Sequence, residues 1–163
     1  MIRVSFFAWL AALAVTINAA EKPNILLIYV DDVGYNDIGC YGAKDPAIET
    51  PHIDQLAAEG VRFTNWISPS PVCSPSRAGL LTGRYPMRNG VPTAMTATGT
   101  FGDDHVLNFG LQPSEYTLAE LLKDAGYKTA MFGKSHLGFS PKFFPNNFGF
   151  DTYYGSLGNY PIG

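Results

Sequence analysis

A cysteine and an arginine lie four residues apart in the run Cys73-Ser74-Pro75-Ser76-Arg77, at the start of a predicted helix. Backbone N–H groups and the helix dipole favour an anion at such a terminus, for example a thiolate or a sulfate group. Arg77 follows one helical turn later, and its planar guanidinium suits tetrahedral oxyanions. The spacing therefore indicates a site for an anionic group beside Cys73, although a surface salt bridge would also explain Arg77 alone.

Two adjacent carboxylates, Asp31 and Asp32, follow the apolar run Asn24 to Val30. The run predicts a strand buried on both faces of a parallel sheet, and α/β sheets bind ligands at the carboxyl ends of such strands. Because successive strand residues point to opposite faces, the two carboxylates can converge only where the pleat breaks. A Ca²⁺ ion would relieve their repulsion. A solvated strand end is the competing interpretation.

A lysine and a histidine lie two residues apart in Gly133-Lys134-Ser135-His136-Leu137-Gly138, directly after a third predicted strand. From an extended segment both side chains can face one site. The ammonium group of Lys134 can neutralise a sulfate oxygen, and His136 can move protons near neutral pH. Taken alone, the pair would more simply be the exposed end of a strand.

Together these runs resemble the formylglycine-dependent sulfatases. Residues Cys73 to Arg84 are similar to the family signature C-x-P-S-R-x-x-x-L-T-G-R, and Gly133 to Gly138 to its second signature, G-K-W-H-L-G, with Ser135 in place of the usual Trp. The resemblance extends from about Pro23 to Gly158. It also includes the segments Thr50-Pro51-His52-Ile53-Asp54 and Gly149-Phe150-Asp151, and its last part looks most like arylsulfatases and N-acetylgalactosamine-6-sulfatase-type enzymes.

The resemblance implies an alkaline-phosphatase-like fold and a Ca²⁺-dependent sulfuric ester hydrolase. Asp31 and Asp32 would bind the Ca²⁺ ion, and Cys73, converted to Cα-formylglycine (3-oxoalanine) by a formylglycine-generating enzyme, would complete that shell. Arg77 would hold the formylglycine hydrate. Lys134 would contact the sulfate, and His136 would orient the hydrate or aid its collapse. The substrate would be a sulfated small molecule or glycan.

Elementary chemistry explains why a sulfatase would convert its cysteine. A plain thiolate would capture the sulfuryl group as a thiosulfate-like ester that has no easy exit. The hydrate of an aldehyde carries two hydroxyls, so one can attack sulfur while the other later collapses to the aldehyde and expels sulfate.

Alternating helices and strands predict an α/β fold with a mostly parallel sheet flanked by helices. The helix signals are Thr50-Pro51 with Gly60, Ser74-Pro75 with Gly83, and the capping box Thr117 to Glu120 with Gly126. The last of these helices is expected to bury Leu118, Leu121, Leu122 and Ala125. The predicted strands are residues 24–30, 61–67 and 128–132, and residues 86–113 are expected to form a long loop. About three strands make an incomplete sheet, so we expect residues 21–163 to be the N-terminal part of a larger, truncated catalytic domain that is inactive and poorly stable alone.

Composition and the first residues set the class and the compartment. With 46% apolar and 15% charged residues the chain is globular, and a net charge of −3 gives no basic surface for nucleic acid. Residues 1–20 predict a signal peptide, with Arg3 before a short apolar stretch and small residues at its end. A membrane anchor is the alternative. We therefore expect an exported protein, periplasmic, extracellular or lysosomal, without stable membrane insertion after cleavage.

The two cysteines and the superfamily leave alternatives open. In an exported protein Cys40 and Cys73 could form a disulfide, but the run around Cys73 favours a free Cys40 thiol, expected to be buried. A phosphonate or phosphate-ester hydrolase of the same superfamily could use the same formylglycine. A non-catalytic remnant would keep Cys73 unmodified.

Overall fold

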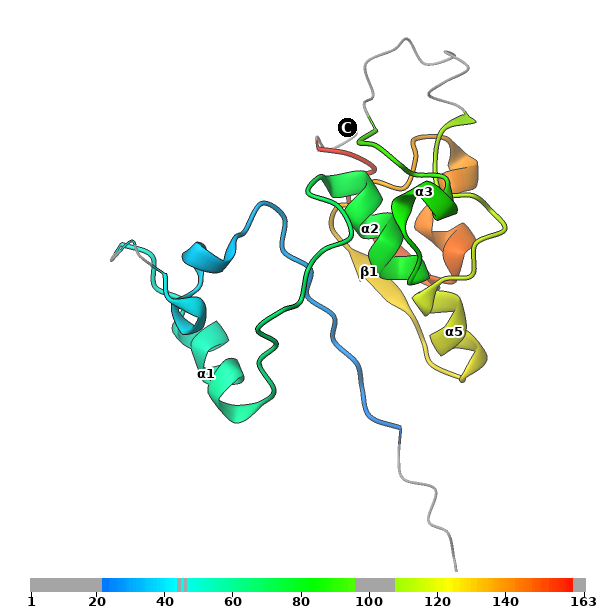
Figure 1. The fold of residues 1–163 in the computed structure, drawn as a ribbon. Coiled ribbons are helices and arrows are strands. Elements are labelled where there is room, and N and C mark those ends of the chain that lie inside the picture. Colours follow the sequence, from blue (N-terminus) through cyan, green and yellow to red (C-terminus); the bar gives the residue numbers. More distant parts are fainter. Residues whose placement is uncertain (1–21, 44, 46, 96–107, 160–163) are drawn as a thin grey trace, which may run out of the picture. The chain divides into compact units, whose positions relative to one another are not determined.

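The computed structural model describes residues 22–43, 45, 47–95 and 108–159 (Figure 1). The predicted signal peptide, residues 1–20, lies outside the described residues. The chain divides into two compact units, residues 1–33 and 34–163. None of the helices in the described part of the chain is both long and apolar enough to cross a membrane.

Helix α1, Pro51–Glu59, begins and ends where the sequence predicts, with Thr50 as N-cap and Gly60 as C-cap. The Thr50 side chain does not cap α1 and instead binds the turn at Gly39, whose N–H donates a hydrogen bond to Thr50 Oγ1 at 2.8 Å. Asp54 Oδ1 accepts from the Cys40 N–H at 2.6 Å. A Cβ atom on Gly39 would clash with the Asp54 carboxylate, so a side chain at this position would push Asp54 away from the Cys40 N–H. The Thr50 to Asp54 segment thus fixes the turn before Cys40.

Helices α2, Cys73–Thr82, and α3, Pro86–Asn89, pack against each other (Figure 1). Gly83 ends α2 in the left-handed conformation, as predicted. Helix α3 falls within the predicted loop 86–113 and was not expected. With four residues it is too short to show helical periodicity, although Pro86 stands at its first turn.

Helix α5, Leu118–Asp124, begins with the predicted capping box. The Thr117 Oγ1 accepts from the Glu120 N–H at 3.2 Å, and Glu120 Oε2 accepts from the Thr117 N–H at 2.8 Å. The predicted apolar face is wrong, because Ala119 is the buried residue of this helix and Leu121 is 53% exposed. Capping is a local property of the chain, whereas burial needs a surface to pack against.

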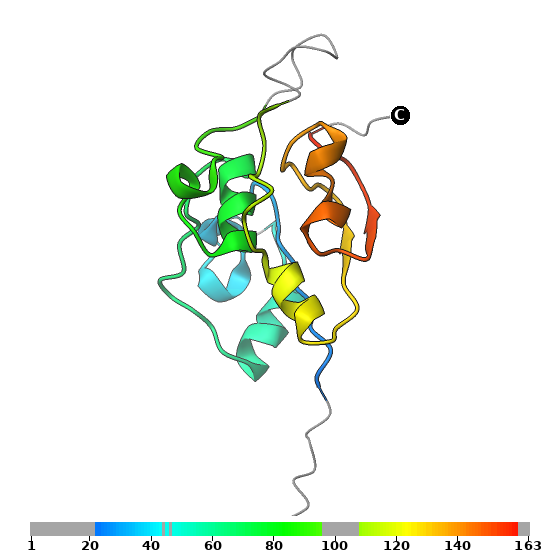
Figure 2. The same ribbon diagram turned by 90° about the vertical axis from the view of Figure 1, so that its right-hand side faces the viewer.

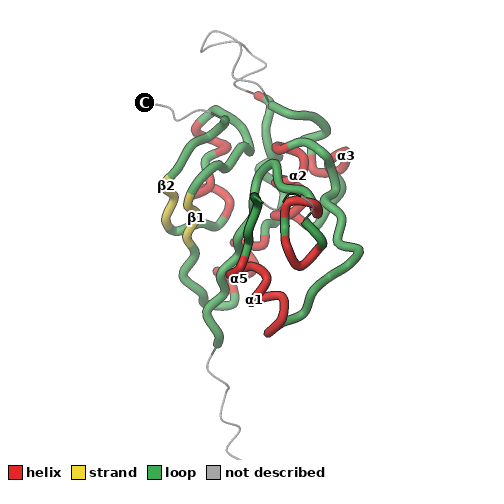
Figure 3. The backbone as a smooth tube through the Cα atoms, turned by 90° about the vertical axis from the view of Figure 1, so that its left-hand side faces the viewer, coloured by secondary structure: helices red, strands yellow, loops and turns green. Residues whose placement is uncertain are grey.

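The described residues form one two-stranded parallel sheet, β1, Ala130–Phe132, with β2, Thr152–Tyr154 (Figure 3). Ala130 pairs with Thr152 and Phe132 with Tyr154. The connection holds two 3₁₀-helices, Pro141–Phe143 and Pro145–Phe148; the second packs against β2 and the first against the second (Figure 2). Strand β1 lies within the predicted strand 128–132, and its parallel pairing matches the prediction. Strand β2 was missed, because three residues in a Gly- and Tyr-rich segment give no periodic signal.

The strands predicted at residues 24–30 and 61–67 are absent from the structure. Leu26 is 85% exposed, Val61 83% and Ile67 82%. A strand exists only through hydrogen bonds to a neighbour, and neither segment pairs with a strand among the described residues. Apolar composition alone therefore did not make these segments strands.

The hydrophobic core lies within the second unit. Its buried members come from α2, from residues 91–95 after α3, from the segment before α5, from the segment after β1 and from the two 3₁₀-helices: Ala78, Leu81, Val91, Met95, Leu111, Leu137, Phe143 and Phe148. Phe109, Phe139 and Phe150 pack against this cluster. Of the aromatic residues that follow Gly138, Phe143 and Phe148 are core residues, whereas Tyr154 is 79% exposed.

Candidate active site

Cys73 is the first residue of α2, with Val72 as the extended N-cap. The predicted start, with Ser74 as N-cap and Pro75 as first helical residue, is wrong by two positions. Pro75 fits the third position because the N–H groups of a first helical turn have no partner within the helix. The helix start leaves Cys73 half-buried, where the positive end of the helix dipole favours a negative charge. Ser74 to Gly79 behind it are buried.

Arg77 joins the two predicted motifs. Its side chain lies one turn after Cys73 and is 9% exposed. Nη1 donates a hydrogen bond to the main-chain carbonyl of Lys134, 57 residues away in sequence, at 2.5 Å. The sequence predicted an anion ligand at this position, and the structure adds a contact that holds the second motif against α2.

The second motif leaves β1 through residues in unusual backbone conformations. Gly133 has φ 103°, His136 φ 52° and Gly138 φ 137°. The segment keeps pairing with the end of β2 and the chain just after it, since the Gly133 N–H donates to the Tyr154 carbonyl and the Ser135 N–H to the Ser156 carbonyl, both at 2.9 Å. The segment is therefore not regularly extended at His136, which changes the simple geometry expected for Lys134 and His136. Lys134 is half-buried.

His136 is 1% exposed, and three groups surround its ring. Its Nε2 lies 3.0 Å from the Met95 carbonyl oxygen, and its ring contacts that of Phe139 edge-on, with centroids 5.9 Å apart. A Cβ atom on Gly158 would lie 2.8 Å from the Phe139 ring and 4.0 Å from Nε2. Sequence reasoning missed Met95, because a residue that acts through its carbonyl leaves no side-chain signal.

Ser135, which replaces the usual Trp of the second motif, is fully buried. Its Oγ lies 3.4 Å from both the Ser156 carbonyl and the hydroxyl of Tyr153. The smaller residue therefore makes polar contacts from the segment after β1 to Tyr153 of β2 and to Ser156 just beyond it.

Arg84, the last residue of the first motif, has a structural partner. Its Nη1 lies 2.6 Å from Glu115 Oε1, whose side chain is 5% exposed. Asn89 Nδ2 donates to the Arg84 carbonyl at 3.3 Å. The second half of the motif thus ties α2 to α3 and to the segment before α5.

Asp31 and Asp32 belong to the first unit, and both are exposed. Asp32 has φ 54°, and it shares a positive φ with only one other non-glycine residue in the described parts of the chain, His136. Residues 24–30 form no strand, so the expected break in a pleat is not seen; instead the backbone takes up a left-handed conformation at Asp32 itself. The carboxylate oxygens of Asp31 and Asp32 suit Ca²⁺. Within the described residues, no group of three His, Cys, Asp or Glu side chains is arranged to hold a metal ion.

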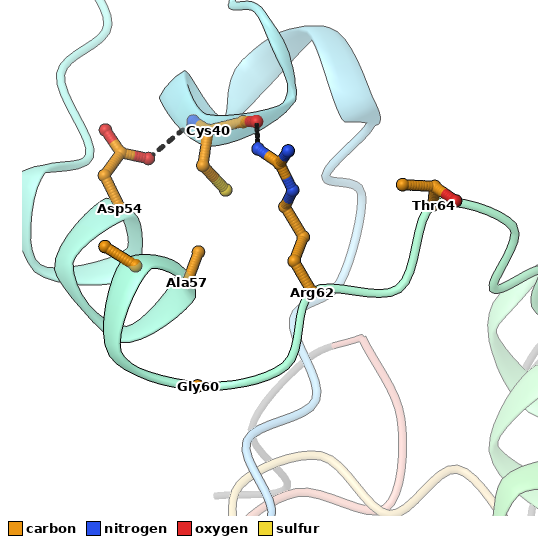
Figure 4. Close-up of a pocket in the computed structure, with 7 residues that line it drawn as sticks. Cys40, Asp54, Ala57, Gly60, Arg62 and Thr64 are labelled. Atoms are coloured by element: carbon orange, nitrogen blue, oxygen red, sulfur yellow. Dashed lines mark hydrogen bonds between the residues drawn. The ribbon is translucent and has the colours of Figure 1, made fainter.

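Both cysteines are free. Cys40 is half-buried rather than buried, and it lines a hollow of about 430 Å³ together with small residues and Arg62 (Figure 4). Arg62 donates a hydrogen bond to the Cys40 carbonyl, and Asp54 accepts one from the Cys40 N–H. None of the predicted catalytic residues lines this hollow, so we assign it no part in the site.

Comparison with known proteins decides the family. The family model of the sulfatases matches residues 23–161. The chain belongs to the sulfatase family. Human N-acetylgalactosamine-6-sulfatase is 48% identical over 140 residues, covering 85% of this chain and 26% of that protein. Human arylsulfatase A is 46% identical over 148 residues, covering 90% of this chain and 27% of its own length.

Solved structures are also similar to the chain. Ps i-CgsB superposes with a TM-score of 0.75 at 42% identity, covering 85% of this chain and 29% of its own. The same protein in complex with k-i-k-neocarrahexaose gives 0.70 at 40% identity, covering 79% and 27%. These likenesses confirm the predicted α/β, alkaline-phosphatase-like fold class. The sulfatase chain described here spans about a quarter of the length of the curated relatives it matches.

Proposed function

We propose that the protein hydrolyses sulfate esters and that Cys73, converted to formylglycine, is its nucleophile. The observation that carries the proposal is the contact between the two sulfatase motifs. Cys73 opens a buried helix, and Arg77 of that helix donates to the carbonyl of Lys134. Family membership supports the same reaction.

The converted side chain would supply two geminal hydroxyls, one to attack sulfur and one to expel sulfate. The residues of the chain have simpler tasks. The N-terminus of α2 favours the negative charge of the sulfate group. Arg77 holds the hydrate and Lys134 neutralises a sulfate oxygen. His136, enclosed and 1% exposed, holds or moves a proton at the hydrate.

A Ca²⁺ ion completes the proposal. Asp31 and Asp32 would hold it, together with the converted Cys73, and the ion would neutralise charge on the sulfate group. The two adjacent carboxylate donors and the left-handed backbone at Asp32 fit such an ion.

A sulfated glycan or a smaller sulfate ester is the proposed substrate. The names of the relatives point to N-acetylgalactosamine-6-sulfate and aryl sulfates, and Ps i-CgsB was solved with an oligosaccharide. Residues 1–20 support export, and maturation would need a formylglycine-generating enzyme as partner.

The test uses the protein as its gene encodes it, co-expressed with a formylglycine-generating enzyme. Mass spectrometry of the Cys73 peptide should show an aldehyde, and the protein should hydrolyse an aryl sulfate faster than a phenyl phosphonate. Cys73→Ala should lower the rate by roughly 10⁶-fold, the cost of removing a hydrolase nucleophile. A thiol at Cys73 after co-expression, with no hydrolysis, would favour the remnant. Faster hydrolysis of the phosphonate would favour the other branch of the superfamily.

A further inference from the structure

Met95 connects the two motifs through its main chain. Its N–H donates to Ser74 Oγ at 3.1 Å, and its carbonyl oxygen lies 3.0 Å from His136 Nε2. Ser74 is the residue after Cys73, so the connection starts beside the proposed nucleophile. One residue thereby links the start of α2 to the histidine of the second motif.

Burial makes this connection a defined one. Ser74 is 0% exposed, His136 1% and Met95 4%. Away from water, a hydrogen bond is electrostatically stronger, and each lost partner leaves a costly unsatisfied group. The bond between Ser74 and Met95 therefore restrains where the Met95 carbonyl lies.

The carbonyl in turn decides where His136 carries its proton. A carbonyl oxygen can only accept a hydrogen bond, so the ring nitrogen that faces it must be the donor. His136 thus carries hydrogen on Nε2, and in the neutral ring the lone pair is on Nδ1. Phe139 packs against the ring and resists its rotation.

We propose that Ser74 is a positioning residue that acts through Met95 to orient His136 and to hold its neutral ring in the Nε2–H form. The role of His136 in proton transfer rests on the proposed function, whereas the link among the three residues does not. Ser74 then positions the Met95 main chain in the folded protein, in addition to following Cys73 in the motif.

Three variants test the link. Ser74→Ala removes the acceptor of the Met95 N–H, and Ser74→Thr keeps a hydroxyl. Thr82→Ala is the matched control, because it also deletes a hydroxyl from α2, one that donates to the Ala78 carbonyl and not to Met95. The protein is used as its gene encodes it, and the fraction of formylglycine at Cys73 is measured for each variant.

The first readout is the ¹³C and ¹⁵N NMR signature of the His136 ring at a pH where the ring is neutral. We expect the Nε2–H form in the unchanged protein, in Ser74→Thr and in Thr82→Ala, and a mixture of the two tautomers in Ser74→Ala. An Nδ1–H ring in the unchanged protein would overturn the proposal even if Ser74→Ala failed to fold. An unaltered His136 signature in folded Ser74→Ala would overturn it too.

The second readout is hydrolysis of an aryl sulfate per formylglycine. Displacement of a proton-transfer group should lower kcat in Ser74→Ala by about 10- to 100-fold with little change in KM, and Ser74→Thr should recover most of the loss. A raised KM with an unchanged kcat would contradict a positioning role. If no variant hydrolyses sulfate esters while the tautomer still responds to Ser74→Ala, the proposed function fails and the link stands.

Discussion

Residues 73–95 and 108–159 bury a hydrophobic core, whereas residues 24–30 and 61–67, at least as apolar, expose their side chains. Leu137, within the polar motif Gly133 to Gly138, is 0% exposed, whereas Leu26, within the apolar run 24–30, is 85% exposed. The difference lies in what each region needs in order to fold. Helices α2 and α5 start and stop on local signals, whereas a strand needs a partner from elsewhere in the chain. An apolar run indicates that its side chains tend to be buried, but it does not identify the element against which they pack.

The largest expected effect comes from truncating one apolar residue in each region. Phe143 is 1% exposed and packs in the core, so Phe143→Ala should lower the free energy of unfolding by about 3–5 kcal/mol through lost burial and a residual cavity. Leu26→Ala should change it by less than about 0.5 kcal/mol in the same 163-residue chain. Urea unfolding followed by circular dichroism measures both. Equal losses of unfolding free energy in the two variants would show that residues 24–30 are packed, and would contradict the contrast drawn between this segment and the core.

A smaller effect is expected at Thr117, where local and long-range contacts coincide. Its hydroxyl caps α5 by accepting from the Glu120 N–H, and it donates to the Phe148 carbonyl at 2.8 Å. Thr117→Ala should cost about 1–2 kcal/mol, since it removes a cap and leaves a buried carbonyl unpaired. Thr117→Ser keeps the hydroxyl and is the control. If both variants lose stability equally, methyl packing rather than capping holds this end of α5.

The smallest effect is expected at Asp151, an exposed link between α5 and the sheet. Its ion pair with Lys123 at 2.8 Å and the N–H of Thr129 lower the pKa of its carboxyl group from 3.8 to about 2. A lowered pKa in the folded state gives stability that is present above pH 4 and lost as the pH falls towards 2. Asp151→Asn should therefore weaken the fall of the melting temperature between pH 5 and pH 2. Salt at 0.5 M should reduce the difference in this pH dependence between the unchanged protein and the variant. Parallel pH curves for the two proteins would exclude this contribution.

The sequence predicted those elements whose signals are local. Thr50, Thr117, Gly60 and Gly83 lie at helix ends where their residue types predict them. The start of α2 was misplaced because Pro75 is compatible with several positions of a first turn. Strand β2 and the unpaired segments depend on distant partners, which a residue pattern does not name.

The candidate site divides in the same way. Cys73, Arg77, Lys134 and His136 were predicted from their types and spacing together with the resemblance to the sulfatase motifs, and the structure brings Arg77 into contact with the Lys134 carbonyl. The bond from Arg77 goes to a carbonyl, and Met95 contributes only main-chain atoms. Every residue carries these groups, so no sequence pattern can reveal which of them is used.

Main-chain contacts also leave room for evolutionary change. Arg77 binds the Lys134 peptide and Ser74 binds the Met95 peptide, so the identity of the side chains beside them can drift without loosening these contacts. Ser135 is an example, because a serine occupies the place of the usual Trp while its N–H still bonds the Ser156 carbonyl. A lineage, or a protein engineer, can therefore vary the side chains around these two motifs while keeping the main-chain contacts that hold the motifs together.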